Sequence, residues 1–136
     1  MKKFYLLICI LLSCCLCGCS NSNQATIDVL ETCKVIDSVI TETSISANKE
    51  YFTITFENEL FYCQDNTNGR PVYTIKIPTD AEFDMYSIIK SIAPSFSKED
   101  FDELNEDNYA TWYKAYREYW RCSKSIEGNT IKYTLQ

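Results

Sequence analysis

Histidine is absent from this chain of 136 residues, and that absence limits its chemistry more than any motif that is present. Without histidine, neither a Ser-His-Asp triad nor a Cys-His pair can activate a nucleophile. Zinc sites that contain histidine are excluded as well, and so is the commonest general base near neutral pH. We therefore expect a protein that is not an enzyme and that holds no metal or cofactor.

Glycine is almost as scarce, with three residues in the chain. Two of them, Gly69 and Gly128, lie beyond residue 19 and are far apart, so no glycine-rich loop is present to cradle a phosphate. A hydrophobic run of about 20 residues, the length that crosses a bilayer, is also missing. The longest apolar segment, Phe4–Leu16, is shorter and is followed at once by the polar residues 20–24.

The N-terminal segment has the pattern of a secretory signal peptide. Lys2 and Lys3 supply the positive charge that precedes the apolar run Phe4–Leu16. The run ends in Leu16-Cys17-Gly18-Cys19, which resembles the lipobox of bacterial lipoproteins. The resemblance implies cleavage before Cys19 and lipidation of its thiol. Leu11-Leu12-Ser13-Cys14 is a second match, but Cys19 leaves the longer apolar run and has glycine before the cut.

Lipidation implies that the protein is localised to the extracytoplasmic face of the cell membrane. Each buried methylene stabilises attachment by about 0.8 kcal/mol, so several acyl chains on one cysteine anchor the protein firmly. We divide the chain into a signal peptide (1–18), a lipidated cysteine with a polar tether (19–25) and one small domain (26–136). Removal of the signal takes away two lysines and no acid, which changes the net charge from −6 to −8. Such a surface is unsuited to nucleic acid.

Three cysteines, Cys33, Cys63 and Cys122, remain beyond the lipobox. The envelope permits disulfides, but three thiols form at most one internal bridge. Cys63 and Cys122 are the predicted pair, because each ends a predicted element beside a polar segment. The alternative is three buried thiols that pack as small apolar side chains.

Hydrophobic periodicity predicts an α+β fold with an N-terminal helix, a three-stranded antiparallel meander, two or three helices and a final strand that joins the sheet. The first helix spans about 25–41, unless residues 39–45 open a strand instead. The strands are expected at 51–56, 60–63, 72–77 and 130–135, and helices at about 83–92 and from Ser97 onward. Ser97 and Asp100 form a variant of the capping box, and Phe96 can pack on Phe101 as a hydrophobic staple.

An aromatic-rich segment, predicted as a helix from about Tyr109 to Cys122, has its rings within an arc of roughly 120° at helical spacing. Packing of this stripe in the core is the favoured interpretation. The functional alternative is a ligand groove for a glycan or peptide, lined by Trp112, Tyr113, Tyr116 and Trp120. The acidic cluster between Glu99 and Asp107 spans a predicted helix start and is interpreted as a solvated surface.

The sequence favours a lipoprotein that binds a ligand or partner of the cell envelope without catalysis. One alternative is a small hydrolase that uses paired carboxylates on envelope glycans. Another is an accessory subunit whose aromatic surface is covered by a second envelope protein. Exposure of the aromatic segment separates these hypotheses, since burial of Trp112 and Tyr116 is incompatible with the groove and a large open apolar patch favours the subunit.

Overall fold

The structure is a computed structural model that describes residues 29, 31–48, 50–115 and 117–136. The predicted signal peptide, Cys19 and the tether lie outside these residues. Within the described part of the chain, no helix has the length and apolar character needed to span a bilayer.

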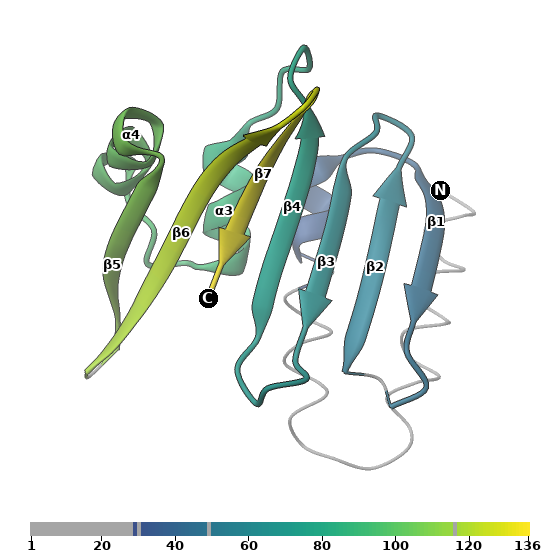
Figure 1. Ribbon diagram of the computed structural model, residues 1–136, viewed down its shortest axis with the longest axis horizontal. Coiled ribbons are helices and arrows are strands. Elements are labelled where there is room, and N and C mark those ends of the chain that lie inside the picture. The colour runs from purple at the N-terminus through teal and green to yellow at the C-terminus, as the bar shows by residue number, and fades with distance from the viewer. Residues whose placement is uncertain (1–28, 30, 49, 116) are drawn as a thin grey trace.

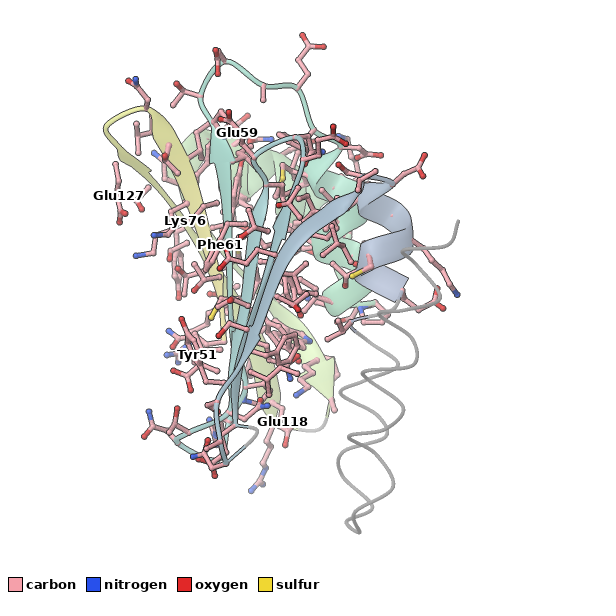
Figure 2. All side chains as sticks on the ribbon, turned by 90° about the vertical axis from the view of Figure 1, so that its right-hand side faces the viewer. Tyr51, Glu59, Phe61, Lys76, Glu118 and Glu127 are labelled. Atoms are coloured by element: carbon pink, nitrogen blue, oxygen red, sulfur yellow. The ribbon has the colours of Figure 1, made fainter. Side chains whose placement is uncertain are left out.

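In the described residues, seven strands form one antiparallel sheet, and the helices pack on one of its two faces (Figures 1 and 2). The strands are β1 (Ile40–Ile45), β2 (Tyr51–Phe56), β3 (Phe61–Asp65), β4 (Val72–Pro78), β5 (Tyr109–Ala115), β6 (Glu118–Glu127) and β7 (Thr130–Leu135). The helices are a short N-terminal helix that ends at Ile36, α3 (Met85–Ile92) and α4 (Lys98–Asp107). The predicted α+β fold is confirmed at this level.

The spatial order of the strands is β1-β2-β3-β4-β7-β6-β5. The chain builds the sheet from β1 to β4, leaves it through α3 and α4, and re-enters at the far edge as β5 (Figure 1). It then returns toward the centre, where β7 pairs with β4 from Tyr73↔Leu135 to Pro78↔Thr130. The final strand therefore joins the sheet as predicted, and the predicted meander is part of a four-stranded one.

Local signals in the sequence mark several element boundaries correctly. Ser97 caps α4, its Oγ accepts from the Asp100 amide at 3.1 Å, and the Asp100 carboxylate accepts from the Ser97 amide at 2.7 Å. Phe96 and Phe101 pack with ring centroids 6.2 Å apart, as the staple requires. Gly69 and Gly128 both have positive φ, at 75° and 62°, in the turns after β3 and β6.

The N-terminal helix is shorter than predicted. It ends at Ile36, and Asp37 has a φ of 48°, a left-handed conformation that stops helix propagation. The alternative, that residues 39–45 open a strand, is confirmed by β1 and its pairing with β2. The β-branched residues of this segment pack well on a pleated surface and lose side-chain entropy in a helix.

The predicted helix from Tyr109 to Cys122 is wrong, because this segment is the β5–β6 hairpin. A period of 3.6 gathers the aromatic residues of this segment on one face, whereas a period of 2 divides them between the two faces of a strand, and local spacing alone does not choose between the two. Strand pairing decides the outcome, since β6 gains a second partner in β7, from Cys122↔Leu135 to Glu127↔Thr130. Tyrosine and tryptophan also favour strands.

The hydrophobic core lies between the helices and the face of the sheet that they cover. We call this side the covered face; it includes Ile54, Tyr62, Ile75 and Tyr133, which lie side by side in the strand register. Each of these four side chains is at most 5% exposed. Ile89 and Phe96 reach the same core from the helical layer and are 0% exposed. The other side of the sheet has no described helix against it and is called the open face.

Candidate ligand surface on the open face of the sheet

The four residues predicted to line a groove do not share one surface. Trp112 and Trp120 are 5% and 7% exposed and lie on the covered face, whereas Tyr113 is 55% exposed on the open face. Tyr116 is outside the described residues. Strand alternation separates these side chains, since neighbours along a strand point to opposite faces. The predicted groove is therefore replaced by a core packing role for the tryptophans, the outcome that the sequence favoured.

The buried tryptophans belong to a continuous series of ring contacts. Trp112 lies 4.7 Å from Phe96 of the helical layer and 6.4 Å from Trp120, measured between ring centroids. Trp120 extends the series to Tyr73 at 6.1 Å. On the outer side of Trp120, the Lys114 ammonium lies 4.8 Å from the ring centroid. These contacts account for both tryptophans through packing.

A row of mostly hydroxyl-bearing side chains crosses the open face from one edge of the sheet to the other. Consecutive strands pair Ser44 with Thr53, Thr53 with Cys63, Cys63 with Thr74, Thr74 with Thr134, Thr134 with Ser123, and Ser123 with Tyr109. Neighbours in the row are about 4.8 Å apart, the spacing of adjacent strands. The row offers hydroxyl groups that donate and accept hydrogen bonds, and the buried thiol of Cys63 interrupts it between Thr53 and Thr74.

Exposed tyrosines occupy one end of this face. Tyr113 and Tyr119 are cross-strand partners whose rings meet edge to face, with centroids 5.7 Å apart. They are 55% and 59% exposed, and Tyr109 on the same face is 46% exposed. Sequence reasoning missed Tyr119 and Tyr109 as candidate binding residues, because a helical period grouped them with the tryptophans. A strand period separates the two sets.

Two lysines lie directly opposite each other at the other end of the face. Lys76 on β4 is the register partner of Lys132 on β7. The Lys76 ammonium lies 5.9 Å from the centroid of the Phe61 ring, and the Lys132 ammonium is 3.2 Å from a carboxylate oxygen of Glu127. Figure 2 shows Lys76, Phe61 and Tyr51 on the side of the sheet away from the helices. No local pattern in the sequence predicts this pair, because it exists only through the pairing of β4 and β7.

The predicted disulfide between Cys63 and Cys122 is wrong in this structure, where both thiols are free. Cys63 is paired with Thr74 on the open face, whereas Cys122 is paired with Leu135 on the covered face. Their strands, β3 and β6, are three positions apart in the sheet, which is about 14 Å at the usual strand spacing. A bridge needs Cα atoms within about 7 Å.

The alternative of three buried thiols is what the structure shows. Cys33, Cys63 and Cys122 are 4%, 6% and 0% exposed. Burial raises the pKa of Cys33 and of Cys122 to about 12. Burial also raises the pKa of Cys63, against a smaller lowering from its hydrogen bond with Tyr51. Thiols held in the protonated form are poor nucleophiles and poor metal ligands.

The carboxylates of the described residues form no metal site, and two of them have a lowered pKa. No group of three or more Asp, Glu or Cys side chains there is arranged to hold a metal ion. Hydrogen bonds from Thr67 and from Ser87 lower the pKa of Asp65 and of Asp84, respectively. A general acid for glycoside hydrolysis needs the opposite shift.

The open face therefore combines exposed tyrosine rings, a row that consists mostly of hydroxyls and two lysine ammonium groups on one side of the sheet. Flat aromatic rings pack against apolar ligand surfaces, and the hydroxyl and ammonium groups donate hydrogen bonds to ligand oxygens. No protein-family model, curated protein sequence or solved structure matches this chain.

Proposed function

We propose that this protein is a lipid-anchored extracytoplasmic lipoprotein whose open sheet face binds a glycan of the cell envelope. The observation that carries the proposal is the chemistry of that face, where exposed Tyr109, Tyr113 and Tyr119 adjoin a row of hydroxyl side chains. A sugar ring has apolar C–H faces and polar edges, so it is complementary to aromatic rings that stand beside hydrogen-bonding groups.

A glycan suits this face better than a protein partner does. The core of a stable protein interface is apolar and depleted in lysine. The centre of the open face instead carries Thr74, Thr134, Lys76 and Lys132. An accessory subunit that is covered by another protein remains the second candidate, and direct glycan binding by the isolated lipoprotein separates the two.

The anchoring part of the proposal depends on the lipobox at Leu16–Cys19. Metabolic labelling with a palmitate analogue is expected to label the wild-type protein and not the Cys19→Ala variant. The variant is also expected to leave the membrane fraction. Labelling that persists in Cys19→Ala, or a purified product that still begins at Met1 without acyl groups, would contradict the anchor.

The binding part is tested with the full-length lipoprotein in detergent micelles. Affinity electrophoresis in gels that contain a neutral or an acidic polysaccharide is expected to retard the wild-type protein in at least one gel. Tyr119→Ala is expected to remove most of the retardation, whereas Tyr119→Phe retains it because the ring is preserved. As a matched control, Val35→Ala truncates an exposed apolar residue of the N-terminal helix, 41% exposed, and is expected to have no effect. Retardation in no gel would overturn glycan binding.

A further inference from the structure

The charges of the molecule are distributed unevenly between its two sides. The chain has a formal net charge of −6. On the helical side, α4 (KEDFDELNED) carries six acidic residues against one lysine. On the open face, β4, β7 and β6 present Lys76, Lys132 and Arg121. The open face is therefore the side of this acidic protein that repels an anionic ligand least.

The open face also carries acidic residues, and they stand at its margins: Glu42 on the edge strand β1, opposite Thr55, Asp65 at the end of β3 and Glu127 at the end of β6. Asp65 ends β3 and accepts hydrogen bonds from the Thr67 amide and hydroxyl in the following turn. Glu127 ends β6 and pairs with Lys132. Among the described residues, neither Lys76 nor Arg121 forms an ion pair. The centre of the face thus has cationic groups in excess.

The Lys76–Lys132 pair is unfavourable for the sheet itself. Like charges on directly opposed residues of antiparallel strands destabilise the pairing, whereas opposite charges there stabilise it. The Cα atoms of the two lysines are about 5 Å apart as cross-strand partners. The two ammonium groups themselves lie toward opposite neighbouring strands, that of Lys76 at the Phe61 ring on β3 and that of Lys132 at Glu127 on β6. An anionic ligand on this face is attracted to Lys76, which has no ion pair among the described residues, and competes with Glu127 for Lys132.

The geometry extends from this pair to the tyrosines. The cross-strand row that contains Lys76 and Lys132 continues on β6 at Ser125, the register partner of Lys132. Tyr119 lies on the same strand as Ser125, about 20 Å from it at the usual rise per residue. Arg121, Ser123 and Tyr109 lie along the way on the same face. A ligand that reaches both ends must be an extended chain. From these observations, and resting on the proposed glycan function, we infer that the open face binds a carboxylated polysaccharide, with Lys76 and Lys132 holding its acidic groups and the tyrosines its sugar rings.

The test measures binding of three defined probes to the full-length lipoprotein in detergent micelles by isothermal titration calorimetry. The probes are a galacturonate hexamer, which is carboxylated, the neutral maltohexaose, and inorganic polyphosphate. We expect the galacturonate hexamer to bind more tightly than either of the others, and its affinity to fall as ionic strength rises, because salt screens exposed charges.

The lysine pair is tested by Lys76→Gln/Lys132→Gln, which is expected to weaken galacturonate binding by roughly tenfold at low salt. The matched control is Lys34→Gln/Lys98→Gln, which changes the net charge equally but on the helical side, where both lysines form ion pairs within their own helices. The control is expected to bind like the wild type. Lys76→Arg/Lys132→Arg retains the charge and is expected to retain binding. Circular dichroism melting curves confirm that each variant is folded.

The outcomes separate the inference from the proposed function. Equal, salt-independent binding of galacturonate and maltohexaose that still requires Tyr119 would overturn the charge-based inference and leave glycan binding intact. Tighter binding of polyphosphate through the same lysines would overturn the choice of a carboxylated ligand. An equal loss of affinity in the helical-side control would show a general charge effect and would also overturn the inference. Binding of neither sugar probe contradicts both the inference and the proposed function.

Discussion

Trp112 and Trp120 lie directly opposite each other on β5 and β6, with their ring centroids 6.4 Å apart and their planes within 19° of parallel. The next pair along the hairpin, Tyr113 and Tyr119, faces the other way and meets edge to face at 5.7 Å. One hairpin thus contributes an aromatic pair to the core and another to the open face. The first pair is expected to determine stability and the second to contribute to binding.

Truncation of an aromatic side chain is expected to lower the free energy of unfolding much more on the covered face than on the open face. Trp120→Ala removes a buried ring and is expected to lower the free energy of unfolding by about 3–5 kcal/mol. Tyr119→Ala removes one member of an exposed cross-strand pair, which costs about 0.5–1 kcal/mol. Urea unfolding followed by circular dichroism measures both values. A Tyr119→Ala cost equal to that of Trp120→Ala would contradict the assignment of the two faces.

The cysteines are expected to remain unbridged in the folded protein. Peptide mapping under non-reducing conditions, after thiol blocking in denaturant, is expected to find Cys33, Cys63 and Cys122 each alkylated. The physical reason is that Cys63 and Cys122 lie on opposite faces of the sheet with two strands between their own. A linked peptide that contains Cys63 and Cys122 would contradict either the strand order of the sheet or the placement of Cys122 on its covered face.

Alkaline pH is expected to destabilise the fold through its buried thiols. The pKa of Cys33 and of Cys122 rises from 9.0 to about 12 on burial. Because the folded-state pKa is the higher one, this contribution to stability is fully present below pH 9 and is lost as the pH rises to about 12. The slope in that window is about 1.4 kcal/mol per pH unit for each thiol.

Urea unfolding at a series of pH values measures this dependence. Cys33→Ala/Cys122→Ala is the control, and it is expected to flatten the decline between pH 9 and 12, even though it lowers stability at neutral pH. A decline of the same steepness in the double variant would assign the effect to other groups.

The capping box of α4 is expected to contribute measurably to stability. Ser97→Ala removes the acceptor for the Asp100 amide and is expected to cost about 1 kcal/mol. Ser97→Gly is expected to cost only a few tenths of a kcal/mol, since glycine at this position leaves the amide open to water. Thermal unfolding of the two variants provides the comparison. Equal losses would indicate that the hydroxyl group is not the stabilising feature.

Local chemistry in the sequence determined the parts of the structure that depend on near neighbours. Alternation located β2 and β7 with the same bounds as the structure, and Ser97 with Asp100 marked the start of α4. Gly69 and Gly128 marked turns because a positive φ is easily adopted without a side chain. These features depend on interactions within a few residues, and such interactions can be read directly from the order of the residues.

Tertiary pairing alone decided the rest. The segment from Tyr109 to Cys122 fits a helix locally, and it is a hairpin because β6 pairs with both β5 and β7. That pairing places Tyr119 on the open face and Trp120 in the core, separates Cys63 from Cys122, and brings Lys76 opposite Lys132. Contacts between residues that are distant in the chain gain their free energy only when the whole sheet assembles. Local spacing in the sequence therefore could not predict the candidate surface.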